Sequence, residues 1–215
     1  MTLPIFLTPK TKWPVGALAG GIATAMYLLS NHIHLFEPRQ LPMTWIDEAI
    51  PFLPHTLWIY TSEYYLFISV YILAKDMASV NKYLYSFMAL QTVSVLIFIF
   101  WPTTFPRDAF PLPETLDDLT YHAFAFLRTA DSPASCAPSL HVSSCYLSSF
   151  IFLTEQKKKF PFFFCWATAV AITTLTTKQH YLIDVIWGFG MAILFYWIFH
   201  RWIPYRYIAG DQANR

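Results

Sequence analysis

Long runs of uncharged, apolar residues dominate this chain and determine the solvent in which it folds. Of its 215 residues, 56% are hydrophobic and only 13% are charged. This composition leaves too few polar side chains to cover a water-soluble globule of that size. A helix of about 20 apolar residues crosses the hydrocarbon core of a bilayer. The sequence therefore predicts a helical protein that crosses a membrane several times.

Charged residues and prolines bound the apolar runs and allow the spans to be located. We predict an all-α fold with about six transmembrane helices. They cover roughly residues 13–33, 56–74, 83–101, 138–154, 160–177 and 180–202. Residues 1–215 form a single integral membrane domain in this interpretation, because no internal repeat or second domain is visible.

Basic residues are distributed unequally between the two sides that these spans create. One side holds ten of them: Lys10, Lys12, Lys75, Lys82, Lys157, Lys158, Lys159, Arg201, Arg206 and Arg215. The other side holds four: Arg39, Arg107, Arg128 and Lys178. Because cytoplasmic segments are enriched in Lys and Arg, we expect both termini to be cytoplasmic. The expected location is a bacterial inner membrane with the outer loops in the periplasm, and the alternative is a eukaryotic secretory-pathway membrane.

Two outer stretches, residues 43–53 and 116–127, alternate apolar and polar side chains and predict helices that lie in the membrane interface. Between them, residues 102–113 are rich in proline, which predicts an ordered connection.

Charge and cysteine usage exclude several classes of function. A formal net charge of +1 does not provide the clustered basic surface that nucleic-acid binding requires. Cys136, Cys145 and Cys165 lie far apart, without the close pairs typical of zinc sites or disulfide frameworks. We expect them to pack as small apolar groups, and we expect no metal and no cofactor.

Ionisable residues near the bilayer are costly, so they are the first candidates for function. His180 and Asp184 are four residues apart, which places them on one face of a helix. The carboxylate then accepts a hydrogen bond from one imidazole nitrogen and leaves the other to act as a nucleophile. Glu63, in the second predicted span, is a further candidate that either approaches the site or satisfies a polar contact.

The same side of the membrane carries groups suited to a phosphate. Pro138 and Ser139 open a helix, whose N–H groups and dipole favour an anion. Arg107 and Lys178 supply positive charge for phosphate oxygens, and His141 is placed to protonate a leaving oxygen. Each of these residues alone has an ordinary explanation as an interfacial or packing residue. Their conjunction on one side of the membrane favours a phosphate site.

Three stretches, 102–107, 138–141 and 180–184, resemble the three signature motifs of the type-2 phosphatidic acid phosphatase and haloperoxidase superfamily. The second reads Pro-Ser-Leu-His, with Leu140 where the family commonly has glycine. This variant is more similar to the branch that contains inositol phosphorylceramide synthases. The resemblance implies His180 as the phosphorylated nucleophile, Asp184 as its orienting partner and His141 as acid and base. It also implies Ser139 and Arg107 as phosphate ligands.

The chain departs from the family pattern at two cationic positions. Phe100 stands where the first motif usually has a lysine, and Thr174 stands where the third usually has an arginine. Lys178 is a candidate replacement for one of them.

Together these features predict a metal-independent lipid phosphate or diphosphate phosphatase whose site faces the outer side. Its expected partners are a phospholipid or isoprenoid phosphate substrate and membrane lipid. A lipid phosphotransferase, which hands the phosphoryl group or a phospho-headgroup to an alcohol, is the alternative. A third interpretation, motivated by the missing cations, is a non-catalytic lipid-binding protein. The sequence makes no prediction of oligomeric state.

Overall fold

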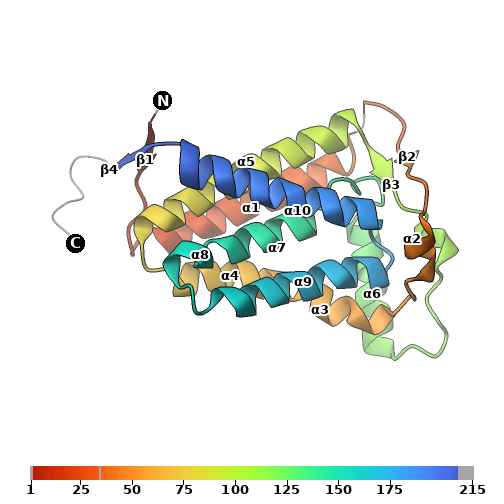
Figure 1. Cartoon of the computed structure of the whole chain (residues 1–215). Helices are drawn as coiled ribbons and strands as arrows, with labels where there is room; N and C mark the ends of the chain where they lie inside the picture. The colour runs from red at the N-terminus through yellow and green to blue at the C-terminus, as the bar shows by residue number, and fades with distance from the viewer. Residues whose placement is uncertain (1, 34, 208–215) are drawn as a thin grey trace.

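The computed structural model describes residues 2–33 and 35–207 as a bundle of helices that run roughly along one axis (Figure 1). The main helices are α1 (Lys12–Ser30), α4 (Glu63–Leu73), α5 (Met77–Phe100), α7 (Leu140–Phe150), α9 (Phe160–Thr176) and α10 (Leu182–Trp197). The shorter helical segments are α2 (Trp45–Ala49), η1 (Pro54–Thr56), α3 (Leu57–Thr61), η2 (Arg107–Ala109), α6 (Asp118–Ala130), α8 (Phe152–Glu155) and the π-helix η3 (Ile198–Trp202). The predicted helical fold class is confirmed.

Two pairs of short parallel strands mark the two ends of the bundle. Near the N-terminus, β1 (Leu3–Ile5) pairs with β4 (Tyr205–Tyr207), and we call this the terminal end. At the opposite end, β2 (Arg39–Gln40) pairs with β3 (Thr103–Thr104), close to α2 and α6 (Figure 1). We call that the site end.

Three helices in the described part of the chain are long and apolar enough to cross a membrane. They are α1, α5 and the continuous helix Leu182–Trp202 formed by α10 and η3. These correspond to the first, third and sixth predicted spans. The other predicted spans are also helical but shorter or interrupted: the second divides at Ser62 into α3 and α4, and the fourth divides at Ile151 into α7 and α8. The fifth is α9, with 17 residues.

Burial explains why α7 has a weaker apolar signal than the other main helices. Every residue of α7 except His141 is buried, so this helix faces protein on all sides. Its hydroxyl groups are bonded inside the bundle: Tyr83 and Ser148 share a hydrogen bond of 2.8 Å, and Gln91 donates to Ser144 Oγ at 3.1 Å. Serine is tolerated there because each polar group has a partner.

The outer surface of the bundle is apolar. Leu18, Tyr65 and Phe162, from three different helices, are 60–70% exposed. A surface of this kind is stable against lipid chains rather than water, which agrees with the three helices that are long and apolar enough to cross a membrane.

The terminal end gathers the larger group of basic residues, as far as the chain is described; Arg215 lies outside the described residues. Lys12 begins α1, Lys75 precedes α5, and Lys157–Lys159 separate α8 from α9. Hydrogen bonds join these turns, since Lys12 Nζ donates to the Ala74 carbonyl at 3.2 Å.

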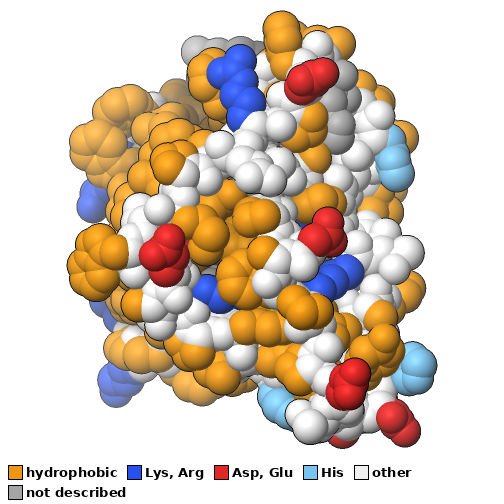
Figure 2. All heavy atoms as spheres, turned by 90° about the vertical axis from the view of Figure 1, so that its right-hand side faces the viewer, with side chains coloured by type: hydrophobic (Ala, Val, Ile, Leu, Met, Phe, Trp, Pro, Cys, Tyr) orange, Lys and Arg blue, Asp and Glu red, His pale blue; other side chains and the backbone are white. Residues whose placement is uncertain are grey.

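The site end contains the two stretches with alternating polarity. Only Trp45–Ala49 of the first is an α-helix, whereas α6 confirms a helix over most of the second. In α6, Phe124 packs inward while Leu119 and Phe126 are 69% and 74% exposed. Figure 2 looks onto this end and shows apolar side chains interspersed with separated charged groups.

Candidate active site

His180 lies in the loop between α9 and α10, where its position differs from the sequence-based prediction. The helix α10 begins at Leu182, so His180 and Asp184 do not share a helical face. They still meet, because Asp184 is in the first turn and its carboxylate turns back toward the loop. Its Oδ2 lies 3.4 Å from His180 Nδ1 and accepts a 2.9 Å hydrogen bond from the Tyr181 N–H. The first turn of a helix also favours a negative charge.

His141 faces His180 from the first turn of α7. The two imidazole rings are 5.8 Å apart, centroid to centroid. On its other side, His141 Nε2 lies 2.7 Å from the Tyr60 hydroxyl and 3.5 Å from Glu63 Oε1. His141 therefore lies between the second histidine and a buried carboxylate.

Ser139 joins the two histidine-bearing segments. It caps α7 by accepting a hydrogen bond from the Val142 N–H, and its own N–H donates to the Asp184 carbonyl at 3.1 Å. Of the two residues predicted to open this helix, Ser139 is its N-cap, whereas Pro138 precedes the cap and lies outside the helix. The backbone of Ser139 also lies close to Gly188, where an added Cβ would be 2.6 Å from the Ser139 carbonyl oxygen.

The proline-rich connection is bound to the loop that precedes Ser139. Thr103 accepts hydrogen bonds from the Cys136 N–H at its carbonyl and from the Ala137 N–H at its hydroxyl, at 3.1 and 2.8 Å. The first and second motif stretches are thereby held together at the site end.

Arg107 is brought to this end in a buried ion pair that the sequence did not indicate. Its Nη1 donates to the Asp131 carbonyl at 2.6 Å and its Nη2 to the Asp131 carboxylate at 2.7 Å. The Tyr27 hydroxyl donates to the same carboxylate, and the Tyr27 ring lies edge-on to His141 with centroids 6.4 Å apart. A short chain of contacts therefore links Arg107 to the histidines.

Lys178 adopts a left-handed backbone conformation, with φ of 53°, where the chain leaves α9. Its Nζ donates to the Asp47 carbonyl at 2.7 Å and lies 4.9 Å from the centre of the Phe110 ring. Burial lowers the pKa of the Lys178 amine, and the nearby Asp47 acts in the opposite direction. Lys178 therefore neighbours His180 in sequence but uses its amine to fasten α2.

Asp47 holds the histidine loop from a distant part of the chain. Its Oδ1 accepts a 2.7 Å hydrogen bond from the Leu182 N–H, the first residue of α10. Its other oxygen accepts from the N–H and hydroxyl of Thr44, which caps α2. The Thr-x-x-Asp spacing of a capping box was the only sequence signal for this residue.

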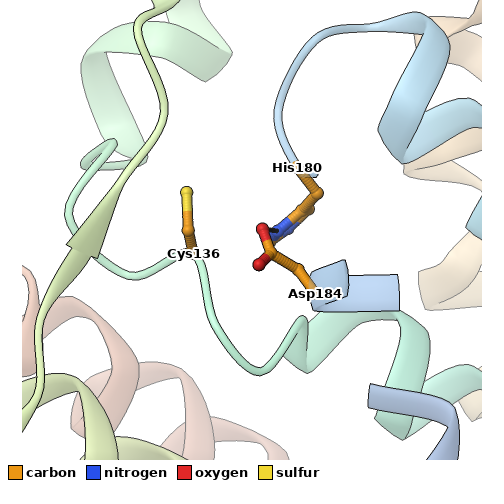
Figure 3. A group of neighbouring side chains, drawn as sticks. All are labelled: Cys136, His180 and Asp184. Atoms are coloured by element: carbon orange, nitrogen blue, oxygen red, sulfur yellow. Dashed lines mark hydrogen bonds and ion pairs between the residues drawn. The ribbon is translucent and has the colours of Figure 1, made fainter. Parts of the chain in front are cut away.

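Cys136, His180 and Asp184 form a cluster of potential metal ligands (Figure 3). One ligand atom from each lies within 4.8 Å of the others. The Cys136 thiol, however, donates to the carbonyls of Pro133 and Gln179. Burial, followed by the charge of Asp184, raises the pKa of this thiol well above its usual range. Because metals bind the thiolate, a metal at the cluster would first have to displace this proton and these two hydrogen bonds.

The structure thus brings His141, His180, Asp184 and Ser139 together, with Arg107 attached through Asp131 and Tyr27. Four neighbours of the site were not predicted from the sequence: Tyr27, Tyr60, Asp131 and Asp47. Glu63 was recognisable as an ionisable residue inside an apolar run.

A protein-family model described as the PAP2 superfamily matches residues 28–198, a stretch that contains every candidate site residue. No curated protein matches the chain. Membership of this superfamily indicates phosphatase-type chemistry with membrane association, which fits the paired histidines and the three helices that are long and apolar enough to cross a membrane. The match covers well over half of the chain, and the protein therefore belongs to the PAP2 superfamily.

Proposed function

We propose that this protein is a membrane-embedded phosphatase that removes phosphate from a lipid phosphate or diphosphate through a phosphohistidine at His180. The observation that carries the proposal is the pair of facing histidines, 5.8 Å apart, with Asp184 beside one and Glu63 beside the other. A nucleophile oriented by a carboxylate, opposite a second proton-transferring group, is the arrangement that two-step phosphoryl transfer needs.

In the first step, His180 Nε2 attacks phosphorus in line while Asp184 holds the Nδ1 side of the ring. A nitrogen–phosphorus bond forms and the phosphorus–oxygen bond to the lipid breaks. His141 gives its proton to the departing lipid oxygen. In the second step, His141 takes a proton from water, which attacks phosphorus and releases inorganic phosphate and neutral His180.

Charge on the transferring group would be stabilised at the start of α7, where Ser139 and the first N–H groups lie. Arg107 contributes from its ion pair with Asp131, sharing its guanidinium between that carboxylate and phosphate. Lys178 contributes only as a through-space charge, because its amine already binds the Asp47 carbonyl.

We further propose that six helical segments cross the membrane, with both termini in the cytoplasm and the site end in the periplasm or lumen. The described basic residues at the terminal end support this orientation. The burial of α7 supports its crossing despite its low hydropathy, since its neighbours shield it from lipid.

One observation favours the alternative of transfer to an alcohol: Leu140 occupies the second motif, as in the inositol phosphorylceramide synthase-like branch. The chemistry differs only in the acceptor, since an alcohol replaces water in the second step. Labelled phosphorus recovered in a second lipid would identify transfer.

The test is release of inorganic phosphate by the purified protein in detergent, with excess chelator. Substrates are phosphatidate, phosphatidylglycerophosphate and a polyprenyl diphosphate, each with and without an alcohol acceptor. We expect release by the wild type and by His122→Ala, a control at an exposed histidine of α6, and none by His180→Ala. Undiminished release by His180→Ala would refute the phosphohistidine mechanism.

A further inference from the structure

An apolar groove of about 360 Å³ lies between α1, α4 and α5 and reaches the proposed catalytic centre. Small residues of α1, namely Gly16, Ala19, Gly20 and Ala23, form one wall. Their spacing of three and four residues puts them on one face of the helix. This wall is open at Gly20, whereas the Tyr71 ring of α4 packs against Gly16. Aromatic side chains of α4 and α5, including Phe67 and Phe87, form the opposite side.

The groove is open toward the surface that faces lipid. Two of its lining residues on α4, Tyr64 and Ile68, are 60% and 49% exposed. Gly20 is also exposed, and nothing lies within 4 Å of the position its Cβ would take. A hydrocarbon chain can therefore enter sideways from the bilayer, between α1 and α4.

One end of the groove is polar, and the rest of its lining is predominantly apolar. Tyr27, Glu63 and His141 line it at the site end, while Trp13 lines it at the other end of α1. A lipid whose phosphate lies between His141 and His180 would thus have its chain directed along this groove. The polarity of the groove matches an amphiphile with one charged end.

The residues of α1 that line the groove extend over more than the thickness of one leaflet. Trp13 and Tyr27 are fourteen residues apart on α1, which corresponds to about 21 Å of helix. One leaflet contributes about 15 Å, half of the hydrocarbon core. A chain that fills the groove reaches beyond the middle of the membrane.

We infer that this groove binds a hydrocarbon chain of the substrate, and that the preferred substrate is a lipid phosphate with a chain longer than one leaflet. The inference rests on the proposed function for the position of the phosphate. It adds the substrate class and the residues that select chain length.

Two neighbouring glycines provide a matched test. Gly20 lines the groove, whereas Gly21 does not, and both have open space at the Cβ position. Gly20→Leu fills the groove, and Gly21→Leu adds the same side chain toward lipid. Both changes raise helix propensity equally.

Phosphate release is measured for both variants and the wild type with a short and a long prenyl phosphate, geranyl and undecaprenyl. Each methylene of the substrate chain that is buried in the groove raises affinity about fourfold. A leucine side chain that displaces two or more of these methylenes should therefore lower kcat/KM for the long-chain substrate at least about tenfold. We expect Gly20→Leu to show this loss with the long chain alone, and Gly21→Leu to match the wild type. Equal behaviour of the two variants, or a loss that is independent of chain length, would overturn the inference while leaving the phosphatase intact.

A second readout does not require turnover. A long prenyl phosphate with a photoreactive group on its chain should label residues 16–27 of the wild type and of Gly21→Leu, and label Gly20→Leu much less. If no substrate is hydrolysed, the proposed function fails, and this labelling alone decides whether the groove holds the chain. Labelling elsewhere, or labelling of all three proteins alike, would reject the groove.

Discussion

Glu63 Oε1 lies 3.5 Å from His141 Nε2, and both residues lie at the polar end of the groove. A buried carboxylate beside an imidazole stabilises the protonated ring, the form that donates a proton to a leaving group. Glu63 does not reach the phosphate in this mechanism, so it acts as a positioning residue through His141.

Glu63→Gln should lower kcat by about 10- to 100-fold, because the amide keeps the shape but loses a carboxylate oxygen that orients the His141 ring for proton transfer. KM should change little, because Glu63 does not contact the phosphate in this mechanism. Thermal unfolding should change little, because glutamine has nearly the same volume and keeps an oxygen that can accept a hydrogen bond. A wild-type kcat would exclude the pairing from the mechanism.

Arg107→Lys should destabilise the protein, because a lysine cannot make both hydrogen bonds that Arg107 gives to Asp131. The loss of one charge-assisted bond costs about 1–3 kcal/mol, and the melting temperature should fall by roughly 2–10 °C. The matched control is Arg39→Lys, an exposed arginine stacked on Trp101. Similar melting temperatures for the two variants would mean that the Arg107–Asp131 ion pair contributes little to the stability of the folded protein.

Gly188→Ala should separate α10 from the start of α7. The added Cβ would meet the Ser139 carbonyl oxygen at 2.6 Å, which forces a shift of backbone. Overpacking of this kind costs about 1–3 kcal/mol, and phosphate release should fall because His180 moves relative to His141.

Gly190→Ala, two residues further along α10, is the control for this change. Nothing lies within 4 Å of its Cβ position, so the variant should gain up to about 1 kcal/mol from helix propensity. A fully active Gly188→Ala protein would show that the close approach is not needed for the site.

Asp47 predicts a pH dependence at the site end. Burial raises its pKa, but hydrogen bonds from Thr44 and Leu182 and the charge of Lys178 outweigh this effect and lower it. A lowered folded-state pKa means that the carboxylate stabilises the fold above its unfolded pKa of about 3.9. That contribution is lost as pH falls through the folded value.

Asp47→Asn should therefore melt at a lower temperature than the wild type near neutral pH, and the difference should shrink below about pH 4. Melting curves across this range test the prediction, with the exposed neighbour Glu48→Gln as the control. If the difference in melting temperature does not change with pH, the shape of the Asp47 side chain and not its charge is responsible.

Cys136 provides a test of the metal-free mechanism. Because the proposed two-step transfer uses only histidine and carboxylate side chains, we expect phosphate release to be unaffected by excess chelator in the wild type and to persist in Cys136→Ser. Loss of activity on chelation, restored by zinc in the wild type but not in Cys136→Ser, would instead identify the cluster as a metal site.

The sequence alone determined that the chain folds in lipid, that its fold is helical, and in which order the chemical groups follow one another along the chain. Hydropathy is a local property, so the apolar runs located each helical segment, and α1, α5 and α10 with η3 meet the length of a membrane span. Short motifs carry their spacing with them, which is why His141, His180 and Asp184 were recognisable.

Only the tertiary structure decided which distant side chains surround those groups. Asp47 binds the residue that begins α10, and Asp131 holds Arg107, because separate segments fold over the site end. Glu63 reaches His141 because α4 packs beside α7. The serine-rich α7 is a buried helix because its neighbours surround it. None of these contacts is marked by a periodic pattern or a fixed spacing of residues in the sequence. Each contact depends on how segments far apart in the chain pack together.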